Sequence, residues 1–265
     1  MRAIDTHSHF NLSQFDADRD EAISRMEEKD VCTICVGVDE ETSAKAVDLA
    51  ARHDSIWAIV GQHPTEWHQE FNLDAFASLA QQGKVVAIGE CGLDYYRDRD
   101  RVHPEEQQKL FRLQIEFAIE SKLPLMLHIR PRQGTMDAYD DALSILKEYK
   151  TAHPELCGTS HFFVGDRRIA QGFLDLGFHI SFSGVITIFP EYEDIVRFVP
   201  LDRILSETDA PFAAPLPWRG TRSEPWQVQA VVEKIAELKA LPLEAVQSQL
   251  LKNAQLLFSL PGVEW

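Results

Sequence analysis

Residues 3–9 read AIDTHSH: a short run typical of a β-strand, ending in two histidines spaced two residues apart. Seven further short runs rich in apolar and β-branched residues follow along the chain, separated by stretches in which apolar residues recur at helical spacing. The eight predicted strands are 3–7, 33–38, 56–62, 85–90, 125–129, 159–163, 178–183 and 204–208.

The segments between these runs predict helices, most clearly over 105–121, 138–149 and 224–238. Pro104 suits the first turn of the first of them. Strands that alternate with helices predict a parallel sheet with crossover connections. Eight such units predict an α/β fold, a closed (β/α)8 TIM barrel formed by one domain over residues 1–265. A doubly wound open sheet is the alternative, but it normally uses fewer strands.

Imidazoles and carboxylates gather at the predicted carboxyl ends of the strands, where barrel enzymes carry their chemistry. Taken singly, each could be an ordinary core or capping residue. Together they predict a metal site at this end of the barrel, because imidazole and carboxylate are ligands of zinc, manganese and similar ions. Six ligands with one bridging carboxylate could hold two ions, an arrangement suited to phosphate-ester hydrolysis. The predicted ligands are His7, His9, Glu90, His128, His161 and Asp209, and His63 follows the third strand.

Several motifs resemble those of the TatD-type metal-dependent deoxyribonucleases, within the wider amidohydrolase-like superfamily. They are His7-Ser-His9, Gly-Gln-His63-Pro64, Gly89-Glu90-Cys-Gly-Leu-Asp94-Tyr-Tyr96, Leu127-His128-Ile-Arg130, Ser160-His161-Phe and Glu207-Thr-Asp209-Ala-Pro211. The resemblance covers nearly the whole chain. It implies one to three divalent ions (Mg, Mn or Zn). It also implies that His7, His9 and Asp209 hold one ion, that His128 and His161 hold another, and that Glu90 bridges them. It further implies phosphodiester cleavage, often as a 3′–5′ exonuclease on single-stranded DNA.

The chain departs from that family in the loops that would face a substrate. Arg130 is followed by Pro-Arg-Gln-Gly, Phe162 stands where the family usually has cysteine, and Pro217-Trp-Arg219-Gly-Thr-Arg lacks the usual Lys and Asn. Two other functions therefore stay open. An amidohydrolase-like enzyme would cleave a small amide, lactone or ester, but many of these place a modified lysine where this chain has Glu90. A non-catalytic binding barrel is the third reading.

We expect three catalytic residues and four substrate contacts. Glu90 would bridge the ions, Asp209 would act as general base, and His63 would contact the phosphate, protonate the leaving group or simply form a His-Pro turn. Nine arginines fall in predicted loops after strands, and of these Arg130 and Arg219 are the expected phosphate contacts. Tyr95, Tyr96 and Trp218 could stack on bases. The four expected substrate contacts are His63, Arg130, Arg219 and Tyr95.

Composition narrows the partners and the compartment. The formal net charge of −16 argues against sequence-independent binding to duplex DNA. No apolar run approaches the length of a membrane span, and the first ten residues lack a signal-peptide pattern. Cys32 and Cys35 have CxxC spacing, but strand alternation points them to opposite faces, so we expect reduced, buried thiols. The prediction is a cytoplasmic monomer that acts on single-stranded DNA or another phosphoester, without a membrane or an obligate protein partner.

Overall fold

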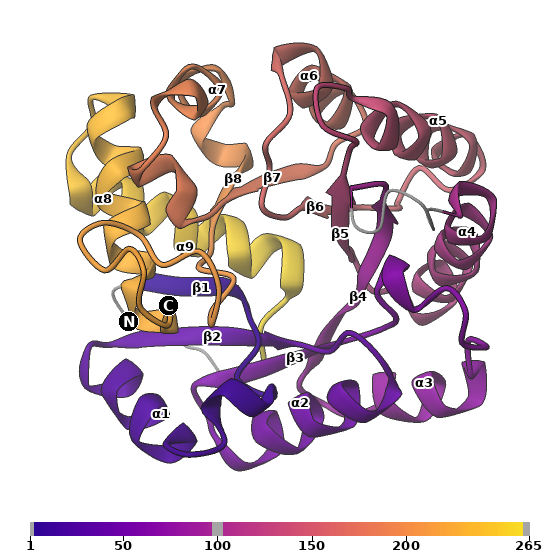
Figure 1. The fold of residues 1–265 in the computed structure, drawn as a ribbon, viewed down its shortest axis with the longest axis horizontal. Coiled ribbons are helices and arrows are strands. Elements are labelled where there is room, and N and C mark those ends of the chain that lie inside the picture. Colours follow the sequence, from indigo (N-terminus) through magenta and orange to yellow (C-terminus); the bar gives the residue numbers. More distant parts are fainter. Residues whose placement is uncertain (1–2, 97–102, 262–265) are drawn as a thin grey trace.

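The computed structural model describes residues 3–96 and 103–261, and its eight strands are parallel and adjacent in chain order (Figure 1). Helices surround the strands, which confirms the (β/α)8 prediction. The strands are β1 (Ala3–Ser8), β2 (Val31–Val36), β3 (Ile56–Val60), β4 (Val85–Asp94), β5 (Leu125–Arg130), β6 (Gly158–Ser160), β7 (His179–Phe182) and β8 (Ile204–Ser206).

The seam between β8 and β1 completes the barrel with few main-chain contacts. One isolated parallel bridge joins Ser8 to Ala210. Just beyond β8, the Asp209 amide donates to the His7 carbonyl at 2.9 Å, and the His9 amide donates to the Ala210 carbonyl at 2.7 Å. The first predicted ligands and the last are therefore brought side by side by the closure of the barrel.

Helices connect successive strands and cover the outside of the sheet (Figure 1). The predicted helix at 224–238 instead begins at Val228, because Glu224 caps a short 3-10 turn at Pro225–Gln227. The helices are α1 (Arg19–Glu28), α2 (Glu40–Arg52), α3 (Leu73–Ala80), α4 (Pro104–Ser121), α5 (Asp137–Ala152), α6 (Arg167–Asp175), α7 (Glu193–Phe198), α8 (Val228–Lys239) and α9 (Leu243–Phe258). In the described part of the chain, no helix has the length and apolarity that crossing a membrane requires.

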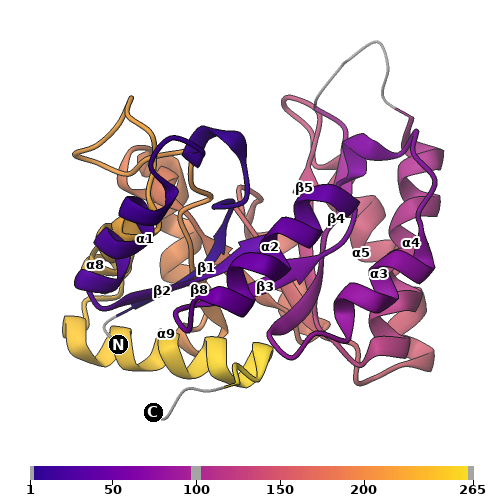
Figure 2. The ribbon, with the colours of Figure 1, turned by 90° about the horizontal axis from the view of Figure 1, so that it is seen from below.

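Two apolar clusters form the core, and the smaller one closes one end of the barrel. The larger cluster lies between the strands and the surrounding helices. The smaller one joins residues near the starts of the strands, such as Ile4, Trp57 and Met126, to Leu257 and Phe258 of α9. Figure 2 shows α9 lying along this side of the barrel, opposite the loop that rises between β8 and α8. The polar residues at the carboxyl ends of the strands therefore line the other, accessible end.

Strand β4 differs most from its prediction, because it continues to Asp94 instead of ending at Glu90. Its register with β5 shifts between Ile88 and Cys91. Gly92 has a φ of 138°, and a Cβ atom there would overlap the carbonyl oxygen of His128. Glycine is thus required for the close approach of these two strands, which brings Glu90 and His128 together.

Candidate metal centre

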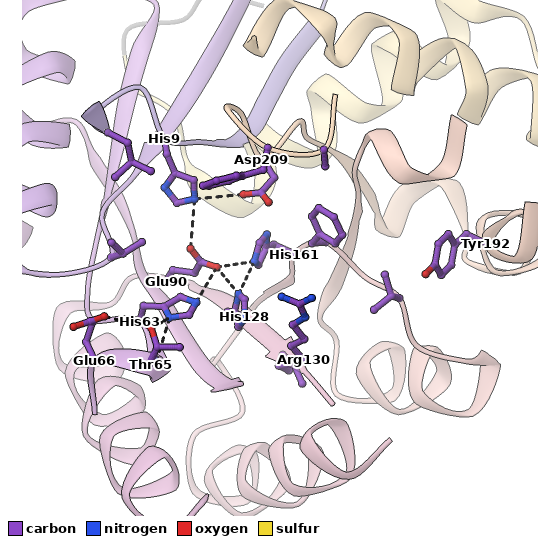
Figure 3. A pocket seen from close by; sticks show the side chains of 17 residues that line it. His9, His63, Thr65, Glu66, Glu90, His128, Arg130, His161, Tyr192 and Asp209 are labelled. Atoms are coloured by element: carbon purple, nitrogen blue, oxygen red, sulfur yellow. Dashed lines mark hydrogen bonds and ion pairs between the residues drawn. The ribbon is translucent and has the colours of Figure 1, made fainter. Parts of the chain in front are cut away.

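Six predicted ligands converge at the carboxyl ends of five strands, although they are up to 202 positions apart in the chain. Figure 3 labels all of them except His7. His7 Nε2 lies 3.2 Å from His9 Nε2, and Asp209 Oδ1 lies 3.4 Å from His9 Nε2. On the other side, His128 Nδ1 lies 3.3 Å from His161 Nε2. The donor atoms therefore form two adjacent groups, which we call the His7 group (His7, His9, Asp209) and the His128 group (His128, His161).

The carboxylate of Glu90 lies between these two groups and presents one oxygen to each. Oε2 is 3.5 Å from His7 Nε2 and 3.6 Å from His9 Nε2. Oε1 is 2.6 Å from His128 Nδ1 and 2.8 Å from His161 Nε2. This is the geometry expected of a bridging carboxylate, and the oxygen and nitrogen donor set fits divalent cations.

Hydrogen bonds behind the imidazoles set which nitrogen faces the centre. The second nitrogen of His9 (Nδ1) lies 2.9 Å from the Val36 carbonyl, that of His161 (Nδ1) lies 3.2 Å from Glu207 Oε1, and that of His128 (Nε2) lies 3.1 Å from Asp94 Oδ2. Because these oxygens accept hydrogen bonds, the outer nitrogens carry the protons. In the neutral rings, each inner nitrogen has the lone pair that a cation requires, whereas a protonated His128 ring donates from Nδ1 to Glu90 Oε1.

His7 is held differently. Among the described residues its Nδ1 has no hydrogen-bond partner. Its ring instead stacks on that of His161, with centroids 3.9 Å apart and planes inclined by 11°.

Glu207, Asp94 and Asp5 support the cluster through hydrogen bonds, and the sequence reasoning did not single them out as site residues. Glu207 also accepts from the Phe162 amide at 2.7 Å. Asp5 accepts from the Thr208 hydroxyl and amide across the barrel seam. A signal for all three existed, because each is a carboxylate in or next to a predicted strand and close in sequence to a ligand. All three side chains are buried, and charged side chains are seldom fully buried unless they are paired.

The charges of the cluster stabilise one another. Burial alone would raise the pKa of Glu90, but the charges of His161 and His7 and the hydrogen bond with His128 hold it well below its usual range. Burial opposes protonation of His161, yet Glu90 and Glu207 raise its pKa well above the ordinary value. Burial and the neighbouring His161 lower the pKa of His7. The negative charges of Glu90 and Glu207 therefore favour a positive charge beside them, such as a protonated imidazole or a bound cation.

His63 sits beside the His128 group, with its Nε2 3.8 Å from Glu90 Oε1. The Thr65 amide donates to His63 Nδ1 at 3.2 Å. Because an amide can only donate, Nδ1 is the acceptor and Nε2 carries the proton of the neutral ring. His63 thus presents a donor to the site, and it also caps the short 3-10 turn at Pro64–Glu66. A His-Pro turn and a contact to the phosphate or leaving group both agree with this position. His63 also lies with Glu90 and His128 in a set whose donor atoms are close enough to share an ion, but Nε2 would first have to lose its proton.

A pocket of about 540 Å³ opens over the cluster. It is lined by the ligands His9, Glu90, His128, His161 and Asp209 together with apolar side chains (Figure 3). The other polar side chains of the lining are His63, Thr65, Glu66, Tyr192 and one arginine, Arg130. Asp209 reaches the pocket from a left-handed backbone conformation, with a φ of 58°. Aspartate tolerates this region better than most residues, and the turn lets its amide bond to His7 while its carboxylate faces His9.

The loop arginines separate into two classes. Arg132, Arg167, Arg168 and Arg222 pair with Asp137, Asp194, Asp140 and Asp18 respectively. Arg130 and Arg219 have no carboxylate partner among the described residues. The guanidinium of Arg130 lies over the ring of Tyr96 at 4.0 Å, and that of Arg219 over Phe189 at 5.5 Å. Arg97, Arg99 and Arg101 lie outside the described residues.

Two of the aromatic residues expected to contact substrate, Tyr95 and Trp218, pack against other side chains of the protein. Tyr95 is 1% exposed, its hydroxyl donates to Asp141 at 2.9 Å, and it is not part of the pocket wall. The prediction that Tyr95 contacts substrate is therefore wrong, because packing under the surface leaves no open ring face. Trp218 packs edge-on against Trp226 at 4.9 Å and is half-buried. Arg219 lies outside the pocket lining, so its expected contact would be made beyond the rim.

Comparison with known proteins agrees with this geometry. The sequence profile of the TatD-related DNases matches residues 4–259. The chain belongs to the TatD-related DNase family. It is 38% identical to the uncharacterised metal-dependent hydrolase YabD of Bacillus subtilis, over 96% of this chain and 98% of that protein. It is 33% identical to the 3′-5′ ssDNA/RNA exonuclease TatD of Erwinia billingiae, over 98% and 100%. The crystal structure of the TatD homologue YjjV of Escherichia coli superposes with a TM-score of 0.88, at 30% identity over 98% and 99%.

Membership of the TatD-related family makes this protein a metal-dependent hydrolase. The His7 group, Glu90 and the His128 group are able to bind metal, and they occupy the end of the barrel at which the pocket opens. The sequence prediction of the family and of the enzyme class is thus confirmed.

Proposed function

We propose that this TatD-related protein cleaves phosphodiester bonds of single-stranded DNA, as a 3′–5′ exonuclease. The observation that carries the proposal is the position of Arg130. It lines the pocket beside Glu90 and His128, and no carboxylate among the described residues neutralises it. A planar guanidinium beside these predicted metal ligands is suited to a phosphodiester, because its fork pairs with phosphate oxygens.

The six ligands would hold two divalent ions, Mg, Mn or Zn, with Glu90 as the bridge. Bound there, such ions polarise phosphoryl oxygens and lower the pKa of a coordinated water. The protein's own residues would orient the substrate and move the protons. Arg130 would fix the phosphate, and the aromatic walls of the pocket would exclude water from it.

Asp209 is our candidate general base. Burial would raise its pKa, but the hydrogen bond from His9 and the charges of His7 and His9 lower it, so its carboxylate is ionised near neutral pH and can accept a proton. It reaches the pocket surface, since 16% of its side chain is exposed. His63 would donate from Nε2 to a phosphate oxygen or to the leaving group, as its tautomer allows.

A nuclease assay tests the proposal. Protein reconstituted with Mg²⁺, Mn²⁺ or Zn²⁺ should shorten a 5′-labelled single-stranded oligonucleotide stepwise from its 3′ end, while Glu90→Gln should not. Glu120→Gln on α4, an exposed substitution of the same type, should leave the rate unchanged. Metal content measured on the same samples should fall in Glu90→Gln only. An oligonucleotide that stays intact with all three ions would remove the nuclease reading.

A small amide, lactone or ester is the second candidate substrate, because the fold is shared with amidohydrolases. The carboxylate at position 90, in place of a lysine, weighs against it. Lys84, the nearest lysine, lies before β4, where its ammonium donates to the His53 carbonyl. Hydrolysis of a lactone or ester panel by a protein that leaves DNA intact would favour this alternative. We expect the protein to act in the cytoplasm, since its four cysteines are free thiols.

A further inference from the structure

Beyond the pocket wall, an exposed ridge runs along the connections that follow β7 and β8. We define the outer ridge as Phe189, Leu216 and Arg219. Phe189 is 37% exposed and Leu216 is 48% exposed, and Arg219 is exposed as well. Large apolar side chains are unusual on an open surface when they gather in one place.

The outer ridge is continuous with the pocket. Tyr192 lines the pocket, and its ring meets that of Phe189 edge-on, with centroids 6.3 Å apart. Phe189 in turn lies under the guanidinium of Arg219 at 5.5 Å. A path of aromatic faces thus leads from the pocket wall at Tyr192 outward to a cation.

The two connections that form the ridge are fixed to each other. The Leu216 amide donates to Thr187 Oγ1 at 2.9 Å. A Cβ atom at Gly184 would lie 2.4 Å from the Ala213 carbonyl oxygen, so the backbones are in close contact there. The ridge is therefore presented by packed backbone, and its shape does not depend on a single loop.

Its chemistry matches that of single-stranded nucleic acid. Aromatic faces that stack on bases and unneutralised arginines that contact phosphates are the two features by which proteins bind single strands. Among the described residues, the other four loop arginines form pairs with carboxylates. Arg130 and Arg219 instead lie over aromatic rings and have no carboxylate partner in the described part of the chain. One of these arginines lines the pocket and the other lies outside its lining.

We propose that the outer ridge is a second nucleotide subsite, which binds the part of a single strand that lies outside the pocket. This inference rests on the proposed nuclease function and names how the enzyme would distinguish a polynucleotide from a small phosphodiester. Arg219 contacts a backbone phosphate, and Phe189 supports a base together with Leu216. The pocket holds the nucleotide that is cleaved.

Substrate length provides the test. Kinetics are measured for oligothymidylate of 12 nucleotides, for the dinucleotide, and for bis(p-nitrophenyl) phosphate, which has no chain to occupy the ridge. Phe189→Ala should raise KM for the 12-mer by roughly 5- to 150-fold, the range that loss of one stacked base produces. Arg219→Gln should raise it by roughly 10- to 150-fold, the range expected when a hydrogen bond between charged groups is lost. KM for bis(p-nitrophenyl) phosphate should stay at the parent value in both variants.

Two exposed controls separate the ridge from general surface effects. Arg168→Gln removes an arginine that is paired with Asp140, and Leu241→Ala removes an exposed leucine that follows α8. Neither should change KM for any of the three substrates. The same 12-mer carrying fluorescein, bound in the presence of a chelator that prevents cleavage, gives an independent readout. The slope of the logarithm of the binding constant against the logarithm of the salt concentration should become less negative by about 0.7 in Arg219→Gln. This is the contribution of one phosphate contact on a single strand.

Three outcomes would count against the subsite. Unchanged 12-mer kinetics in both variants would overturn it while leaving the nuclease function intact. Equal increases of KM for all three substrates would also overturn it, because they would indicate a distorted pocket. A parent protein that hydrolyses bis(p-nitrophenyl) phosphate but neither cleaves nor binds the 12-mer would refute both the nuclease function and the subsite. An oligouridylate arm reports whether the ridge accepts RNA as well as DNA.

Discussion

Asp5 and Thr208 join the first strand to the last at the point where the barrel closes. Thr208 donates to the Asp5 carboxylate from its hydroxyl at 2.6 Å and from its amide at 2.8 Å. Both residues are completely buried. Because β1 and β8 share so few main-chain contacts, this pair fixes the seam from which His7 and Asp209 enter the cluster.

Removing the Thr208 hydroxyl should therefore destabilise the protein. We expect Thr208→Val to lower the free energy of unfolding by about 1–3 kcal/mol, because a buried acceptor loses its donor at nearly constant side-chain volume. Urea denaturation measures the change. Thr159→Val is a matched control: Thr159 is also buried, but its hydroxyl has no partner among the described residues. Equal losses in both variants would show that the hydrogen bond across the seam has no special role.

Glu207 should control metal affinity without touching a cation. Its Oε1 holds the outer nitrogen of His161 and the amide of Phe162, and loss of such a supporting carboxylate typically weakens metal binding 10- to 100-fold. We expect a loss in this range for Glu207→Gln, measured by calorimetric titration with Mn²⁺ or Zn²⁺. Thermal unfolding without metal checks that the fold is retained. Parent-like affinity in a folded Glu207→Gln protein would contradict the orienting role.

His179, at the start of β7, should make stability sensitive to acid. Burial and, to a lesser extent, the charge of nearby Arg203 lower its pKa to about 4. The unfolded chain therefore binds a proton near pH 6.5 that the folded protein takes up only near pH 4. Stability contributed by neutral His179 is complete above pH 6.5 and is lost as the pH falls toward 4.

We expect His179→Gln to flatten the decline of unfolding free energy between pH 6.5 and 4. The difference between variant and parent should reach about 3 kcal/mol across that interval. Chemical denaturation at half-unit pH steps measures it. The profile of His179→Gln gives the slope due to all other titrating groups, and the difference from the parent profile gives the contribution of His179. His153→Gln, which changes a surface histidine, is the control. Parallel pH profiles for His179→Gln and the parent would refute the assignment.

Arg222 should stabilise the loop that carries Asp209. Its guanidinium makes two hydrogen bonds to Asp18, at 2.6 and 2.7 Å, and another to Glu224, which also binds Arg25. This network connects α1 to the segment after β8. We expect Arg222→Met to lower the unfolding free energy by about 1–3 kcal/mol, measured by urea denaturation. Arg168→Met, which breaks an exposed pair with Asp140, should cost about 1 kcal/mol or less. A ranking in the opposite order would contradict the network.

Much of this architecture could be predicted from the sequence because its signals are local. Alternating apolar runs and helical stretches identified all eight strands, and ligand-type residues at strand ends identified the six members of the cluster. Strand lengths were less predictable. β4 continues past Glu90 because Gly92 allows it to approach β5, and β6 ends at Ser160, one residue before His161. Such limits depend on the neighbouring strand.

The fate of the aromatic and charged loop residues could not be predicted in the same way. Tyr95 and Tyr96 are adjacent in sequence, yet one ring is buried against the barrel and the other lies under Arg130. Likewise, Arg219 and Arg222 are three positions apart, but of the two only Arg222 meets a carboxylate, that of Asp18 directly before α1. Their partners come from distant parts of the chain, so local pattern carries no information about them.

The sequence by itself determined the barrel and the kinds of atoms that could gather at its open end, because strand periodicity and residue type are properties of short segments. Only the tertiary structure decided how those atoms face one another. It placed Glu90 between the two histidine groups, and it supplied Asp94 and Glu207 to fix the imidazole tautomers. The physical reason is that hydrogen-bond direction and charge pairing depend on side chains brought together by the closure of the barrel.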